Sequence, residues 1–93
     1  MSGDAFHPGV YIADELEARG WDDQRLSDES GMPCLLIREI VDGHIRVSRA
    51  VSERLESAFG VSAQTWLNLQ AQYDAHMHRQ RQRDAMSDAW GTL

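Results

Sequence analysis

The segment Gly31 to Gly43, "GMPCLLIREIVDG", carries the residues best suited to contact a nucleic acid. A glycine turn, a short helix-forming stretch and a second glycine outline the second half of a helix-turn-helix, whose second helix enters the DNA major groove. Within this stretch Arg38 can donate two hydrogen bonds to guanine, and Glu39 can accept one from cytosine. The segment therefore predicts hydrogen bonding to base edges.

The start of this helix is poorly suited to that chemistry. Pro33 has no backbone N–H to donate, and Cys34 is a weak donor. Leu35 offers only apolar contact, for example to a thymine methyl group. It could also form part of an exposed apolar patch that a protein partner covers, or be half-buried. Because exposed apolar surface often marks a contact site, the partner interpretation is slightly favoured.

Phosphate contacts are expected from residues on either side of the segment. Asp22 and Asp23 lie at the expected start of the second helix, and Asp23 would repel any phosphate close to it unless it turns away. Arg38 could instead be a solvated arginine beside Glu39 or Asp42. The full set of predicted DNA contacts is Gln24, Cys34, Leu35, Arg38, Glu39, His44, Arg46 and Arg49.

Charge limits how such a site could work. The chain has nine arginines, no lysine and fifteen acids, for a net charge of -6. Residues 1–43 contain ten acids and three arginines (-7), whereas residues 44–93 contain five acids and six arginines (+1). Since nucleic-acid binders usually carry a basic patch, this chain needs a local one, or it has another role.

Catalysis and metal binding are not predicted. No nucleophile lies beside a base, and no glycine loop could hold a phosphate. His76 and His78 point in different directions on a helix, so no metal or other cofactor is expected. The single cysteine, Cys34, cannot form an internal disulfide, and it is expected to be an inert thiol. With no apparent signal peptide or membrane span, a cytoplasmic location is expected.

The hydrophobic pattern predicts five short helices, no strand and a compact five-helix bundle. Pro8 should begin the first helix and Gly20 should end it, while Asp22, Ser48 and Ser62 should cap later helices. One domain is expected over residues 1–93, with a polar tail, residues 76–93, that either extends the last helix or frays. The expected helices cover residues 8–19, 22–30, 33–42, 48–59 and from 62 onward.

Apolar residues recur along the helices with helical spacing. Val51, Leu55, Ala58 and Phe59 form one stripe, which is expected to be core. The last helix should divide its large side chains between the core and a dimer interface. The predicted interface residues are Trp66, Leu67, Leu69, Gln70 and Tyr73.

Three motifs together resemble the HigA-type antitoxins, a branch of the Cro/repressor-like (XRE) helix-turn-helix family. They are "HPG" at the first helix, "ELEARG" at its end, and "GVSAQTWLNLQAQYD" near the end of the chain. The resemblance spans roughly His7 to Asp74. It implies a lambda-repressor-like homodimer whose third helix enters operator DNA. Such proteins usually repress their own operon and neutralise an RNA-cleaving toxin, here expected to be a small basic protein.

Two functions remain open at this point. The first is a HigA-like antitoxin and transcriptional regulator that binds an operator as a homodimer through its third helix. The second is a protein-binding module on the same fold with weak or no DNA binding. The resemblance favours the first, while the acidic N-terminal half and the "PCLL" sequence favour the second.

Overall fold

A computed structural model describes residues 5–91 of the chain, and the side chains of residues 5–84. Within residues 5–91 the chain forms five helices and no strand, as the sequence predicted. The helices are α1 (Pro8–Arg19), α2 (Asp23–Ser30), α3 (Cys34–Val41), α4 (Arg49–Phe59) and α5 (Ala63–Gly91).

The helix ends follow local capping chemistry. The Asp22 carboxylate accepts a hydrogen bond from the Arg25 N–H at 2.9 Å, and the Ser48 hydroxyl accepts one from Val51 N–H at 3.3 Å. These contacts satisfy backbone donors that have no partner inside the helix. Helix α2 ends at Gly31, whose φ of 77° is the left-handed conformation that glycine adopts most easily. The turn between α2 and α3 is therefore set by a few neighbouring residues.

The core lies where the five helices meet. Trp66 of α5 is 2% exposed and packs beside Phe59, with ring centroids 6.1 Å apart. Within α3, Ile37 and Ile40 are buried, whereas Leu36 is only partly buried. The buried apolar residues are Ile12, Leu16, Leu26, Met32, Ile37, Ile40, Val47, Val51, Leu55, Phe59 and Trp66. The predicted core stripe on α4 is confirmed. Val51, Leu55 and Phe59 are buried, and Ala58 is partly buried against the core.

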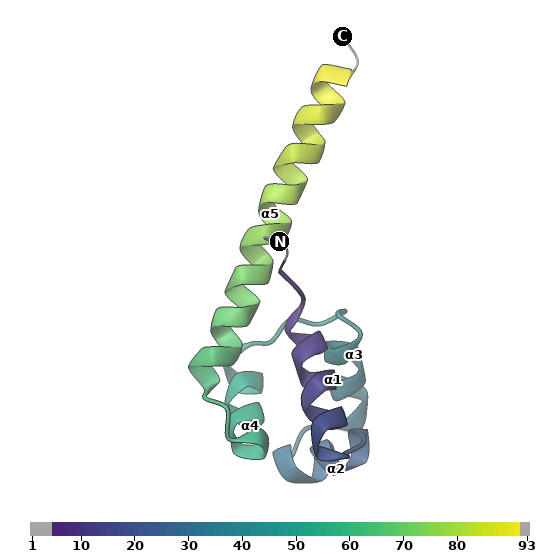
Figure 1. Cartoon of the computed structure of the whole chain (residues 1–93), viewed down its shortest axis with the longest axis vertical. Helices are drawn as coiled ribbons and strands as arrows, with labels where there is room; N and C mark the ends of the chain where they lie inside the picture. The colour runs from purple at the N-terminus through teal and green to yellow at the C-terminus, as the bar shows by residue number, and fades with distance from the viewer. Residues whose placement is uncertain (1–4, 92–93) are drawn as a thin grey trace.

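Helices α1, α2 and α3 lie on one side of the molecule, and α4 and α5 lie on the other (Figure 1). The last helix continues well beyond the bundle. The prediction that all five helices are short is wrong for α5, which has 29 residues. Its polar sequence lacks a regular apolar stripe after Met77, and this is why periodicity did not reveal the length. The molecule consequently measures 55 × 25 × 23 Å.

Helix α5 also holds the loop between α3 and α4. The buried Gln70 side chain accepts a hydrogen bond from Val47 N–H at 2.7 Å and donates one to Asp74 at 2.8 Å. Asp74 in turn accepts a hydrogen bond from Arg46. The loop that follows α3 therefore has a fixed path relative to α5. None of the helices in residues 5–91 combines the length and apolar character needed to cross a membrane.

Candidate nucleic-acid interface

The turn that orients α3 is fastened by side chains from both flanking helices. The Ser27 hydroxyl donates to Met32 C=O at 2.6 Å, and the Ser30 hydroxyl accepts from Met32 N–H at 3.1 Å. Arg54 of α4 reaches the Ser30 carbonyl at 3.5 Å. Met32 itself is buried. These contacts fix the angle between α2 and α3, and sequence reasoning did not identify Arg54 as part of them.

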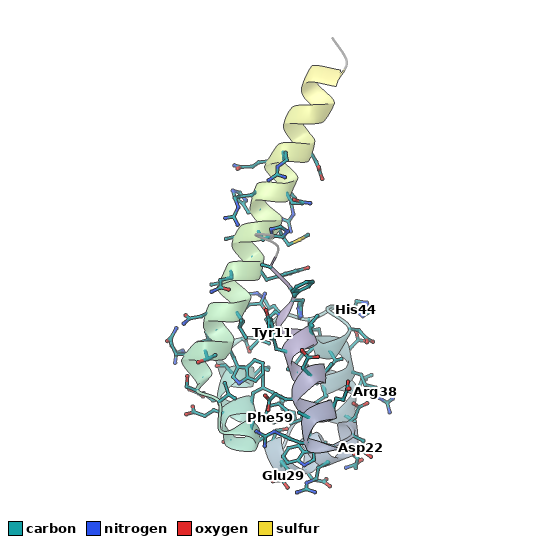
Figure 2. The ribbon with its side chains drawn as sticks, viewed as in Figure 1. Tyr11, Asp22, Glu29, Arg38, His44 and Phe59 are labelled. Atoms are coloured by element: carbon teal, nitrogen blue, oxygen red, sulfur yellow. The ribbon has the colours of Figure 1, made fainter. Side chains whose placement is uncertain are left out.

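The outer face of α3 is exposed, as a DNA-contacting helix requires. Leu35 is 69% exposed, and the Arg38 side chain is 66% exposed. Figure 2 shows Arg38 on the side of the molecule away from α4 and α5, with His44 further along the same side. Ile37 and Ile40 lie on the opposite face of α3 and are buried in the core. Helix α3 is thus anchored on one face and free on the other.

A groove of about 300 Å³ brings three of the predicted DNA contacts together. The Cys34 thiol donates to the Gln24 side-chain oxygen at 3.5 Å, and the Gln24 amide donates to Asp28 at 2.9 Å. Arg38 lies at the same groove. The groove is lined by Leu16, Trp21, Asp22, Asp23, Gln24, Cys34 and Arg38.

Arg38 is paired with an acid from the neighbouring helix. Its Nε donates to the Asp23 Oδ2 atom at 2.9 Å. This hydrogen bond to Asp23 raises the pKa of Arg38 above its ordinary value, so the guanidinium stays charged. Sequence reasoning considered Glu39 and Asp42 as partners, because both lie near Arg38 along the chain. The structure instead turns Asp23 toward α3.

Glu39 and His44 form a second pair on this side of the molecule. The His44 Nδ1 atom lies 2.8 Å from Glu39 Oε2. Because the carboxylate already has this partner, a cytosine amino group would have to compete with His44 or approach the other oxygen. Glu39 is therefore a less available base contact than the sequence suggests.

The other predicted arginines are separated from this groove. Arg46 pairs with Asp74 at another groove, which Tyr73, Met77, His78 and Arg81 also line. Arg49, at the first turn of α4, is exposed and has no ion-pair partner among the residues with described side chains. The structure thus brings Gln24, Cys34 and Arg38 together and places Arg46 elsewhere.

The five residues predicted for a dimer interface differ in exposure. Trp66 and Gln70 are 2% and 3% exposed within the single chain, so they offer almost no surface to a partner. Leu67, Leu69 and Tyr73 are partly exposed. Sequence reasoning had recognised that Trp66 could fill the core, but it did not anticipate the bond between Gln70 and Val47.

A groove of mixed polar and apolar character beside α5 was missed by the sequence analysis. It has a volume of about 350 Å³ and is lined by Ala5, Phe6, Tyr11, Leu69, Gln72, Ala75 and Arg79. Phe6 is 58% exposed and Tyr11 is 37% exposed. Tyr11 directly precedes the buried Ile12 on α1, and such an outward aromatic was the available signal. No cluster of metal-ligating side chains occurs within the described part of the chain.

Comparison with known proteins supports the helix-turn-helix assignment. No family model matches the chain. Virulence-associated protein I of Dichelobacter nodosus is 34% identical over 77 residues, which cover 82% of this chain and 71% of that protein.

Solved structures give the same picture. An antidote protein of a plasmid maintenance system from Nostoc punctiforme has a TM-score of 0.88 and 26% identity, covering 92% of this chain and 94% of its own. An addiction module antidote protein of the HigA family from Coxiella burnetii has a TM-score of 0.80 and 26% identity. The match covers 89% of this chain and 91% of that protein.

A Pseudomonas aeruginosa protein solved in complex with its 28-base-pair operator DNA has a TM-score of 0.81 and 24% identity. The match covers 91% of this chain and 94% of that protein. This last likeness concerns the fold alone. The solved relatives are antidote proteins and an operator-bound protein, not enzymes. The chain belongs to the same family as virulence-associated protein I, and it shares its fold with plasmid-maintenance and HigA-family antidote proteins.

Proposed function

We propose that this protein is an operator-binding antitoxin whose homodimer inserts α3 into the major groove of the DNA upstream of its own gene. The observation that carries the proposal is the free outer face of α3, where Arg38 is exposed and Ile37 and Ile40 anchor the opposite face. The operator complex of a structurally similar protein supports this use of the fold.

The distribution of charge supports the homodimer. Phosphate neutralisation supplies much of the affinity for DNA, and one subunit offers few arginines for it. Arg46 is already paired with Asp74, which leaves Arg49 as an exposed arginine near α3 without an ion pair among the described side chains. Two subunits place two recognition helices about one turn of DNA apart and double these contacts.

The dimer is proposed to form along the exposed side of α5 and the groove beside it, where two aromatic side chains are exposed. Phe6 and Tyr11 lie next to Leu69 there, and exposed aromatics on a small domain mark a contact surface. This assignment keeps Leu69 and Tyr73 from the predicted interface, whereas Leu67 lies on another face of α5, because residues i and i+2 do not share a face. Trp66 and Gln70 support it from within the core.

Toxin neutralisation is proposed to use the acidic side chains of α1 and α2. Asp14, Glu17, Asp28 and Glu29 are exposed there. This surface would attract a small basic protein, because complementary charge steers two partners together.

Titration of the DNA upstream of the gene tests the operator proposal. Binding would be followed by fluorescence anisotropy at several salt concentrations, with random DNA of equal length beside it. We expect sequence-dependent binding that weakens as salt rises. Arg38→Ala should reduce specific affinity by about 1–3 kcal/mol, the range for a bidentate arginine–guanine contact.

Arg83→Ala is the matched control, because it removes the same charge from the projecting part of α5 and should leave specific binding nearly unchanged. Equal affinity for upstream and random DNA at low salt would reject the proposal.

A second function is favoured by one observation, the 69% exposure of Leu35. Beside it on α3, Leu36 lines an apolar groove of about 220 Å³ with Met32 and Pro33. A protein-binding module with little DNA affinity would use this surface. The same titration decides between the two, since that module would not distinguish upstream from random DNA.

A further inference from the structure

We infer that Asp23 is a positioning residue that holds the Arg38 guanidinium ready for a guanine, so that this protein recognises guanine through a pair of residues from two helices. The inference rests on the proposed operator binding. It adds a determinant of sequence preference at a position where an acid would otherwise only weaken DNA binding.

The hydrogen bond between these residues leaves the correct donors free. An arginine side chain has five N–H donors arranged as a planar fork. Asp23 engages the Nε atom at 2.9 Å. The two terminal nitrogens can then donate to guanine N7 and O6, the acceptors that guanine presents in the major groove.

Of the acids near Arg38, Asp23 is the one that accepts its hydrogen bond. Glu39, the next residue on α3, is paired with His44. Asp22 caps α2 by accepting from Arg25 N–H. Asp23 is therefore not needed for the cap, and its carboxylate joins the first turn of α2 to the outer face of α3.

The pair is poorly explained as a stabilising contact. The side chains of Arg38 and Asp23 are 66% and 37% exposed. Exposed ion pairs contribute little to folding because water screens them. Ordering a long arginine before DNA arrives instead lowers the entropic cost of binding. The Asp23 carboxylate thus lowers the overall affinity for DNA, because it repels phosphates, and it raises the discrimination between DNA sequences.

The inference predicts opposite effects on two kinds of binding when the charge of Asp23 is removed. The test uses full-length protein and the upstream DNA segment protected in a footprint. Guanines in that segment are replaced one at a time by 7-deazaguanine, which lacks the N7 acceptor. Inosine is the matched DNA control, because it keeps N7 and O6 and lacks only the minor-groove amino group.

For the natural chain, 7-deazaguanine at one guanine per half-site should weaken binding about fivefold or more, and inosine there should change it little. Asp23→Asn should bind random DNA as tightly as the natural chain or more tightly. Its penalty for 7-deazaguanine should fall below about twofold. Arg38→Lys, which keeps the charge but loses the fork, should lose the same penalty.

Four outcomes separate the inference from its alternatives, with thermal unfolding of each variant confirming that it is folded. If Asp23→Asn keeps the full loss of affinity for DNA with 7-deazaguanine, the positioning role is overturned. It is also overturned if Asp23→Asn binds all DNA more tightly but distinguishes upstream from random DNA as well as the natural chain does. Specific binding by the natural chain without a penalty at any guanine would overturn the inference and leave the proposed function intact. If the natural chain shows no sequence preference at all, both the inference and the proposed function are rejected.

Discussion

His7 connects three parts of the chain through one imidazole ring. Its Nδ1 accepts a hydrogen bond from Gly9 N–H at 2.9 Å and so caps α1. The ring also packs edge-on against Tyr73 of α5, with centroids 5.1 Å apart. Burial lowers the pKa of His7, while the Ile45 backbone and the charge of Asp74 oppose that shift. The cap requires a neutral ring, because a protonated Nδ1 cannot accept.

Acidification should therefore weaken the fold through His7. Its folded pKa lies below the unfolded value of 6.5, so the folded state binds the proton less well. The resulting stability is fully present above pH 6.5 and is lost as pH falls from there through the folded pKa. One group contributes at most about 1.4 kcal/mol per pH unit, and partial exposure reduces this.

Urea unfolding at pH 5.5 and 7.5 measures the effect. His7→Asn keeps a capping oxygen without titrating in this range, so its stability should depend less on pH. Equal pH dependence in both proteins would refute the role of His7, since His44, His76 and His78 are present in each.

Residue contacts were predictable from the sequence only where both partners are close along the chain. The Asp22 and Ser48 caps were predicted, because each acts on a backbone group three residues away. The partner of Arg38 was not, because Asp23 lies fifteen residues earlier and meets it only after α2 and α3 pack. The contact between Gln70 and Val47 spans 23 residues and escaped notice for the same reason.

Helices α1 and α3 approach each other closely at Gly9. A Cβ atom there would lie 2.3 Å from Ile40 O and 2.7 Å from Val41 O. Both atoms belong to backbone, which cannot move aside as a flexible side chain can. The absence of a side chain at Gly9 therefore sets the distance from α1 to α3.

Gly9→Ala should destabilise the protein despite alanine's higher helix propensity. Overpacking a close contact costs about 1–3 kcal/mol, whereas the propensity gain at a helix interior is at most about 1 kcal/mol. The free energy of unfolding from urea titration tests this expectation.

Val10→Ala, at an exposed position on the same helix, should change stability much less. A Gly9→Ala variant as stable as the natural chain would show that α1 can shift without cost.

Helix boundaries followed from sequence because proline, glycine and capping residues act locally. The first four helices lie within one or two residues of their expected ranges. The length of α5 did not follow from periodicity. Residues 71–84 of this helix include no buried side chain, so no core pattern marked that part of the chain as helical.

The exposed aromatics and the Arg38–Asp23 pair line two separate grooves of the molecule. Phe6 and Tyr11 line the groove beside α5, and Arg38 with Asp23 lies at the groove beside α3. A homodimer that uses the first surface leaves the second free for DNA.

Tyr11→Asp should convert the proposed homodimer into a monomer at micromolar concentration, because a carboxylate would be buried in an apolar contact. Size-exclusion chromatography with light scattering measures the mass. Val10→Asp adds the same charge on α1 outside the groove and should remain dimeric.

If Tyr11→Asp stays dimeric while folded, the interface lies elsewhere. A natural chain that is monomeric at high concentration would contradict the dimer altogether.

The length of α5 has a mechanical consequence. A straight helix of 29 residues is about 44 Å long, and its first turns are fixed in the core by Trp66 and Gln70. Because Gln70 also holds the loop after α3, the base of α5 and that loop are mechanically connected. Force applied to the distal part of α5 is therefore expected to reach the loop that follows α3.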